Sequence, residues 1–287
     1  MTPASKIIAQ QHRRAFEAEF ERPEEEIRLD VAALLVGAED EAYLELEVEE
    51  YLRRIAALGQ QARERLAESP QGTRVEVFNH FMFEEVGLHG NAEDYYDPRN
   101  SFLHRVLDRR TGIPITLSVI YMLVGREAGL EVEGIGLPGH FIVRAGEREM
   151  LETVLVDPFR GTMTTLRECQ ERLDQFYEDS PELEEEMFVT TTRLIVMRML
   201  LNLKAIYLKA RLYRQALAVV ERMNTLTRNT DANGHKERGE LLAQLGRLPE
   251  AVSELQAFLN RSPEPQERDE PVREQLRALQ RQMAMRN

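Results

Sequence analysis

The chain has 287 residues, a formal net charge of −13, a hydrophobic fraction of 43% and one cysteine, Cys169. This is enough apolar sequence for one large or two ordinary globular domains, and a single cysteine excludes an internal disulfide and a multi-cysteine metal cluster. The negative charge disfavours nucleic acid and anionic membranes as partners. The sequence also lacks a membrane-length apolar run and an apolar secretory signal, so we expect a cytoplasmic protein.

Residues 1–100 are predicted to be mostly helical. Apolar residues recur at helical spacing in 30–43, 48–66 and 74–88, and Asp30 is a candidate N-cap of the first segment. The stretch 91–100, NAEDYYDPRN, carries turn chemistry because a proline restricts the residue before it. This tight loop leaves no linker, so we expect the helical segment to cover the domain that follows.

The centre of the chain is predicted to be a buried helix followed by a small sheet. The segment 114–128 is apolar almost all round, with Pro114 suited to the first helical position and Gly129 to the position after the last. A short helix capped by Ser101 is expected before it. The predicted fold class is therefore α+β, with the helix packed on an antiparallel sheet. The expected strands are 131–137, 140–145 and 151–159, with a polar turn at 146–149.

From about residue 190 the chain is predicted to be helical and repetitive. Laying 200–223 over 235–263 aligns Tyr213 with Leu248 at an offset of 35 residues, close to the tetratricopeptide period of about 34. The same overlay matches Ala216 with Ala251, small residues suited to a close helix crossing. Two such copies and a last helix make a short capped stack, on whose concave face we expect a protein partner.

A hairpin of the second and third strands brings a histidine to an aspartate. With the turn centred on residues 148 and 149, His140 lies opposite Asp157, and directly opposed residues share one face of a sheet. An aspartate beside an imidazole fixes its tautomer and favours its charged form, as in a nucleophile–base–acid triad. The alternative is a strand-start histidine without a further role. The same register pairs Ile142 with Leu155 and Arg144 with Thr153.

The third member of such a triad would be a nucleophile at the start of the buried helix, where the helix dipole stabilises a thiolate. The helix start, Gly112 to Ile115, carries no thiol or hydroxyl. Ser118, one turn further, is a weaker candidate because a mid-helix serine usually bonds back to a carbonyl. Cys169 lies on a charged helix predicted after the sheet, where we expect it to pack.

Polar residues before the buried helix are candidate pocket residues. Tyr96, Arg99 and Asn100 are expected near His140, together with Gly112; the alternative is a loop that only plugs the core. His80 and Glu84 share a helical face, but the H-E-x-x-H spacing is absent, and so is a phosphate-binding glycine loop. We therefore expect no metal site and no cofactor.

Three motifs together resemble the transglutaminase-like bacterial proteins of the SirB/YchA type: RRTGIPITLS, GLPGHFIVR and VDPFRG. The resemblance covers roughly residues 30–270 and implies a papain-like core followed by tetratricopeptide repeats. In the wider superfamily the core carries a Cys-His-Asp triad. Matched by motif, the histidine falls on His140 and the aspartate on Asp157, whereas the cysteine falls on Pro114. Proline has no nucleophilic side chain, so ordinary thiol chemistry is expected to be lost.

These observations predict three parts: a helical N-terminal cover (1–100), a transglutaminase-like core (101–185) and repeats with a capping helix (190–287). The predicted function is a regulatory or protein-binding module, a pseudoenzyme that keeps the His140–Asp157 pair and takes a small peptide or amide as its ligand. The alternative is a hydrolase or acyl transferase acting on amide or peptide bonds, in which His140 and Asp157 activate another nucleophile or water.

Overall fold

The helix α6 (Pro114–Ala128) is the element on which the first part of the chain is built. Pro114 stands in its first turn, and Gly129 ends it in the left-handed conformation at φ 96°. All of its residues except Arg126 and Glu127 are buried, as expected of a helix that is apolar on every face. The computed structural model describes residues 2–38, 40, 42–147, 153–175, 180, 182–183, 189–228, 230–261 and 269–286.

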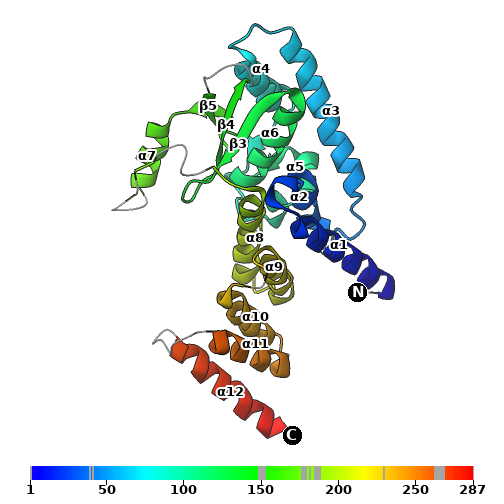
Figure 1. The fold of residues 1–287 in the computed structure, drawn as a ribbon, viewed down its shortest axis with the longest axis vertical. Helices are drawn as coiled ribbons and strands as arrows, with labels where there is room; N and C mark the ends of the chain where they lie inside the picture. The colour runs from blue at the N-terminus through cyan, green and yellow to red at the C-terminus, as the bar shows by residue number, and fades with distance from the viewer. Residues whose placement is uncertain are drawn as a thin grey trace. The chain divides into compact units, whose positions relative to one another are not determined.

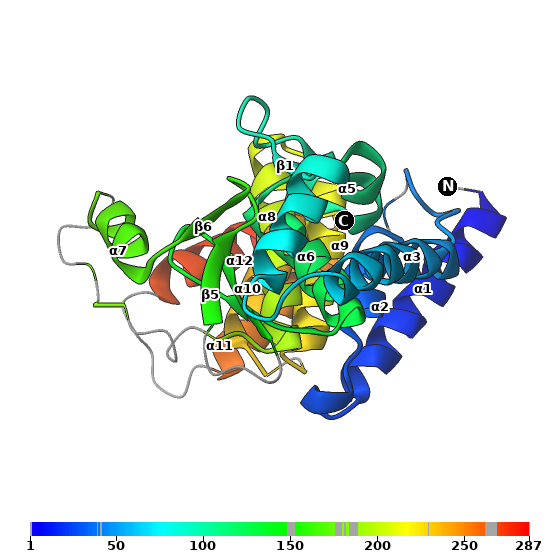
Figure 2. The same ribbon diagram turned by 90° about the horizontal axis from the view of Figure 1, so that it is seen from above.

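A four-stranded antiparallel sheet packs on one side of α6, and the helix α3 (Val48–Ala67) packs on the other (Figure 1). The contact with the sheet is close, because a Cβ added at Gly125 would lie 2.8 Å from the Val132 side chain. Figure 2 shows α6 between the strands and α3. The strands follow one another in the order β3 (Leu130–Ile135), β4 (Ile142–Glu147), β5 (Thr153–Asp157) and β6 (Thr162–Thr164).

The register of the β4–β5 hairpin differs by two residues from the predicted one. Arg144 pairs with Leu155 instead of Thr153. The reason is that β4 continues through Glu147, which we had expected in the turn. Glu147 is buried, and its Oε1 accepts hydrogen bonds from the backbone N–H of Gly72 at 2.8 Å and of Arg74 at 3.3 Å. The turn centre, residues 148 and 149, lies outside the described residues.

The segments before α6 are largely helical. Asp30 does not cap the second helix but lies in its first turn, and Ser101 is the buried last residue of a 3-10 turn rather than a cap. A short parallel pair, β1 (His89–Gly90) and β2 (Thr111–Gly112), closes this region. The helical elements are α1 (Pro3–Glu21), η1 (Glu24–Glu26), α2 (Leu29–Ala38), α4 (Arg74–His80), the π-turn η2 (Phe81–Glu85), η3 (Pro98–Ser101) and α5 (Leu103–Arg109).

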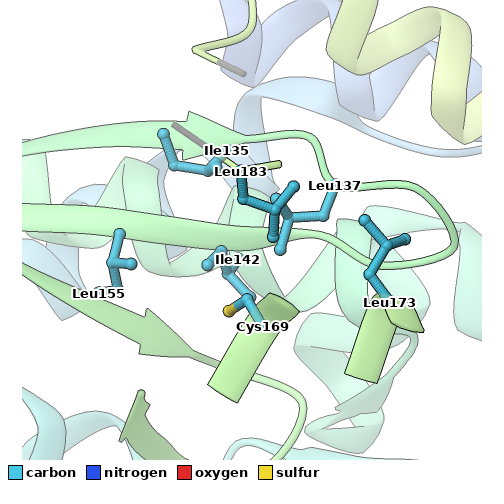
Figure 3. Close-up of a cluster of buried hydrophobic side chains, with 7 residues drawn as sticks. All are labelled: Ile135, Leu137, Ile142, Leu155, Cys169, Leu173 and Leu183. Atoms are coloured by element: carbon cyan, nitrogen blue, oxygen red, sulfur yellow. The ribbon is translucent and has the colours of Figure 1, made fainter. Parts of the chain in front are cut away.

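The helix α7 (Leu166–Asp174) packs on the sheet through an apolar cluster (Figure 3). Thr165 and Glu168 form a capping box at its start, which fixes where the helix begins. Cys169 and Leu173 point from α7 toward the strands, and Cys169 is 4% exposed. The cluster consists of Ile135, Leu137, Ile142, Leu155, Cys169, Leu173 and Leu183.

The chain divides into two compact units, Met1–Met199 and Leu200–Asn287. The helix α8 (Thr192–Lys209) begins in the first unit and ends in the second. In the second unit, α9 and α11 begin 35 residues apart, at Tyr213 and Leu248, and Ala216 and Ala251 are completely buried. The helices there are α9 (Tyr213–Leu226), α10 (Ala232–Gln244), α11 (Leu248–Arg261) and α12 (Glu270–Arg286).

The predicted α+β fold class, with helical repeats after the sheet, is therefore confirmed. Every helix among the described residues is too short or too polar to span a bilayer.

The crossing of α3 over α6 depends on Gly59. A Cβ added there would lie 2.2 Å from Glu127 Cβ, an atom that cannot swing away as a side-chain tip can. Gly59→Ala should therefore lower the free energy of unfolding by about 1–3 kcal/mol, although alanine stabilises an open helix position by about 1 kcal/mol. Urea denaturation measures this change.

Gln61→Ala, at an exposed site of the same helix, is the control and should stay within about 0.5 kcal/mol of the parent protein. An unchanged or increased stability of Gly59→Ala would mean that this crossing is loose.

Candidate functional site

A cavity of about 660 Å³ opens at the end of the sheet where His140 lies. Its wall combines segments that are far apart in the sequence: the loop before α5, the start of α6, the turn between β3 and β4, the turn after β5, and one face of α7. It is lined by Ala92, Tyr95, Pro114, Leu137, Pro138, Gly139, His140, Phe159, Arg160, Cys169, Arg172, Leu173 and Leu183.

His140 and Asp157 are hydrogen-bonded across this end of the sheet. The distance from His140 Nε2 to Asp157 Oδ2 is 2.8 Å, with the imidazole side chain 24% exposed and the carboxylate completely buried. The register error described above was even, so it leaves each β4 side chain on its predicted face of the sheet. His140 lies two residues before β4 and still reaches Asp157. Within the described residues Nδ1 has no hydrogen-bond partner, which leaves this nitrogen for a ligand.

Asp157 binds four hydrogen-bond donors through two oxygens. Oδ1 accepts from the backbone N–H of Phe159 at 3.1 Å and of Arg160 at 3.3 Å. Oδ2 accepts from His140 and from Arg172 Nη1, the latter at 3.0 Å. Burial raises the pKa of this carboxyl, but the hydrogen bond and charge of His140, the hydrogen bond from Arg172 and the backbone hydrogen bond from Arg160 outweigh it and lower the pKa overall. The carboxylate is thus ionised at neutral pH and fixes the orientation of the ring.

Arg198 of α8 holds the turn that carries His140, and sequence reasoning missed it. Its guanidinium donates to Leu137 O at 3.1 Å and to His140 O at 2.9 Å, and it lies 5.2 Å from the centre of the Phe141 ring. A Cβ added at Gly136 would come within 3.1 Å of Arg198 Nη1, so the glycine leaves room for this contact. The available signal was a lone arginine inside the apolar run LIVMRMLL.

Of the two α6 positions considered in the sequence analysis, Pro114 and Ser118, only the first lines the cavity. Pro114 lines the cavity together with His140. Ser118 is completely buried, donates its Oγ hydrogen to Phe141 O at 3.4 Å, and does not line the cavity. Gly112 is also buried away from it. A serine bonded to a carbonyl inside the core has no access to a ligand here.

The loop 91–100 contributes Ala92 and Tyr95 to the cavity, and not the predicted Tyr96, Arg99 and Asn100. Asn100 is completely buried; its Nδ2 donates to Asp94 O at 2.8 Å, and its own carbonyl accepts from Thr116 Oγ1 at 2.7 Å.

The other two predicted residues of this loop, Tyr96 and Arg99, do not line the cavity. Arg99 is paired with Asp97 at 2.8 Å, and Tyr96 is 57% exposed. With Asn100 anchored, it is the Tyr95 ring that lies against Phe159, at 6.2 Å between ring centres. The prediction had the right loop and the wrong side chains.

Among the described residues, no group of three or more histidine, cysteine, aspartate or glutamate side chains is arranged to hold a metal ion.

Asp157→Asn should destabilise the protein by about 3 kcal/mol near pH 7, because Arg172 and His140 lose their buried partner charge. Folding lowers the pKa of Asp157, so its contribution is complete above the unfolded value of about 3.9 and is lost as the pH falls through the folded value. The difference between parent and variant should therefore shrink below about pH 4, as measured by urea denaturation at several pH values.

His140→Ala should cost only about 1 kcal/mol, because the ring is partly exposed. A loss above about 3 kcal/mol would identify His140 as a structural residue instead.

Arg198→Met should lower stability by about 2–3 kcal/mol, because two turn carbonyls lose charged hydrogen-bond donors. The matched control is Arg53→Met, a surface arginine that is 70% exposed and is paired with Glu50. It should change stability by less than about 1 kcal/mol. Equal losses in the two variants, measured by denaturation, would show that the Arg198 contacts add nothing.

Comparison with known proteins places these motifs in a family. A family model for the transglutaminase-like superfamily matches residues 49–201, and one for tetratricopeptide repeats matches residues 203–281. A UPF0162 protein of Xylella fastidiosa (strain Temecula1) is 32% identical over 195 residues, which are 66% of this chain and 68% of that protein.

Two further relatives come from other organisms. A UPF0162 protein of Vibrio cholerae is 28% identical over 200 residues, 68% of this chain and 72% of that one. The mouse F-box only protein 21 is 31% identical over 112 residues, which are 37% of this chain but 18% of that protein. No solved structure matches significantly.

The first family model covers more than half of the chain and includes all the residues that form the cavity. The chain belongs to the transglutaminase-like superfamily.

Proposed function

We propose that this chain is a binding module that holds a peptide segment of a protein partner in the His140 cavity and forms no covalent bond with it. The observation that carries this proposal is that Pro114 and the Asp157-bonded His140 line the same cavity. The family resemblance assigns the attacking thiol to position 114. A proline there leaves an oriented imidazole and a ligand-sized space without the atom that would attack.

An oriented imidazole suits recognition of a peptide bond. With Nε2 on Asp157, Nδ1 is directed to a ligand, where the neutral ring accepts a hydrogen from an amide N–H and the charged ring donates to a carbonyl. The cavity walls supply apolar surface from Leu137, Phe159 and Leu173. Such a mixture of apolar lining and a few placed polar groups is typical of ligand sites.

Cys169 does not replace the absent nucleophile, although it too lines the cavity. Its side chain is 4% exposed and packs in the apolar cluster with Leu155 and Leu173. Burial raises the pKa of the thiol, with Arg172 and a hydrogen bond to Thr164 acting in the opposite direction. Because the thiolate is the reactive form, a thiol held neutral in the core is inert.

The repeats are the second part of the proposal. Stacked helical repeats generally present a surface for protein partners, and we infer that α8 to α12 recruit the partner whose segment enters the cavity. The protein would then act as a cytoplasmic regulatory pseudoenzyme of the SirB/YchA type. We retain the division into a helical cover (1–100), a core (101–185) and repeats (190–287) as part of this proposal.

The position of the absent thiol can be tested by restoring it. Pro114→Cys in a Cys169→Ala background should react with iodoacetamide at pH 6 at least about tenfold faster than the same protein with His140→Ala, because an adjacent imidazolium stabilises a thiolate. Met163→Cys in the same background, at a half-exposed site on β6, supplies the rate of an ordinary thiol. If the Pro114→Cys rate does not depend on His140, position 114 is not the nucleophile position.

The absence of chemistry can be tested on the parent protein. Incubation with peptide p-nitroanilides, p-nitrophenyl esters and an amine acyl acceptor should give no turnover above that of His140→Ala. Turnover that disappears with His140→Ala would replace the binding proposal with the hydrolase or acyl transferase alternative, in which His140 activates water.

A further inference from the structure

The cavity is lined by basic side chains and, within the described residues, by no aspartate or glutamate. The basic side chains are Arg160, Arg172 and His140. The Asp157 carboxylate is completely buried and contacts all three side chains. Its Oδ2 lies 3.0 Å from Arg172, 3.7 Å from Arg160 and 2.8 Å from His140. Two permanent positive charges therefore face one negative charge, and the cavity keeps a positive excess in a protein of net charge −13.

The neighbouring glutamates are engaged elsewhere. Glu168 and Glu171 line a separate hollow of about 360 Å³ that shares Arg160 and Arg172 with the cavity. The Glu168 carboxylate accepts from Thr164 Oγ1 and from the Thr165 N–H, both at 2.9 Å. Glu171 is paired with Arg167 at 2.9 Å. Neither glutamate lines the His140 cavity, so neither cancels its charge from within.

The two arginines differ in how much hydrogen-bonding capacity remains. Arg172 is fixed, because it donates to Asp157, to Thr164 Oγ1 at 2.9 Å and to Glu168 O at 3.1 Å. The Arg160 side chain is 58% exposed, and its guanidinium makes only the 3.7 Å ion pair within the described residues. Arg160 thus retains a fork of N–H donors that matches a carboxylate.

The rest of the wall is apolar and aromatic. It consists of the aromatic side chains of Tyr95 and Phe159 and the apolar side chains of Leu137, Leu173 and Leu183. A ligand that satisfies this wall and the arginines together has an apolar body with an anionic group at one end. A free phosphate has no apolar part to place there, and an apolar amide has no charge for Arg160.

We propose that the cavity recognises an organic anion with an apolar body, and that Arg160 binds its anionic group while Arg172 holds Asp157 and His140 in place. This inference rests on the proposed peptide-binding function. In a peptide, the matching chemistry is a free C-terminal carboxylate next to an apolar side chain.

The test compares N-acetyl-Ala-Ala-Leu with its C-terminal amide on the full-length protein, by isothermal titration calorimetry or by chemical shifts. The acid should bind about tenfold more tightly than the amide, since a charge-assisted bond adds about 1.4 kcal/mol or more. Arg160→Gln should remove this difference by weakening the acid and leaving the amide unchanged. The matched control is Arg167→Gln on α7, 87% exposed and outside the cavity, which should leave both affinities unchanged.

The outcomes separate this inference from the function on which it rests. Equal binding of acid and amide, without an effect of Arg160→Gln, overturns the anion site and leaves peptide binding intact. Binding of neither peptide contradicts both proposals. Inorganic phosphate is the third probe: if it binds at Arg160 as tightly as the peptide acid, the apolar half of the inference is wrong.

Discussion

Asp157 places one fully buried negative charge beneath the cavity, and the site is organised around the cost of that burial. An unpaired carboxylate in a protein interior would cost several kcal/mol, so it must be surrounded by donors. Two come from the backbone of the turn that follows β5, one from Arg172 of α7, and one from His140 of the turn before β4. Three segments of the chain are therefore bonded to one carboxylate. Displacing any of them would leave a buried donor, or the carboxylate itself, without a hydrogen-bond partner.

The sequence was sufficient to predict that this carboxylate meets His140, although the predicted register, with the two residues directly opposed, was wrong. Alternation of side chains depends only on whether an offset is odd or even, and the error was two residues. The extent of β4 depended instead on Glu147, which looks like a turn residue in the sequence GERE. Its partners are backbone groups about 75 positions earlier in the chain, and no local pattern reveals such a contact.

The same limit explains the errors around the cavity. The apolar segment and its end signals, Pro114 and Gly129, located α6 correctly because these signals lie in the helix and its flanking residues. Whether Tyr95 or Tyr96 lines the cavity depends on the buried Asn100, which donates to Asp94 O within the loop and accepts from Thr116 Oγ1 of α6. Arg198 was missed because its hydrogen-bond partners are backbone carbonyls. Every residue has such a carbonyl, so the sequence does not show which ones an arginine will bind. The residues fixed by local geometry were predictable, whereas those fixed by distant backbone groups were not.

Pro114 has a second effect on the start of α6. Proline lacks a backbone N–H, so this position loses a main-chain donor together with any attacking side chain. Enzymes that cleave acyl bonds commonly stabilise the negative oxygen of the tetrahedral intermediate with amide hydrogens near the nucleophile. Proline at this position has neither a nucleophilic side-chain atom nor an amide hydrogen. If position 114 is the nucleophile position, as proposed, a carbonyl bound in this space would meet at Pro114 neither an attacking side-chain atom nor an amide hydrogen that could receive charge on its oxygen.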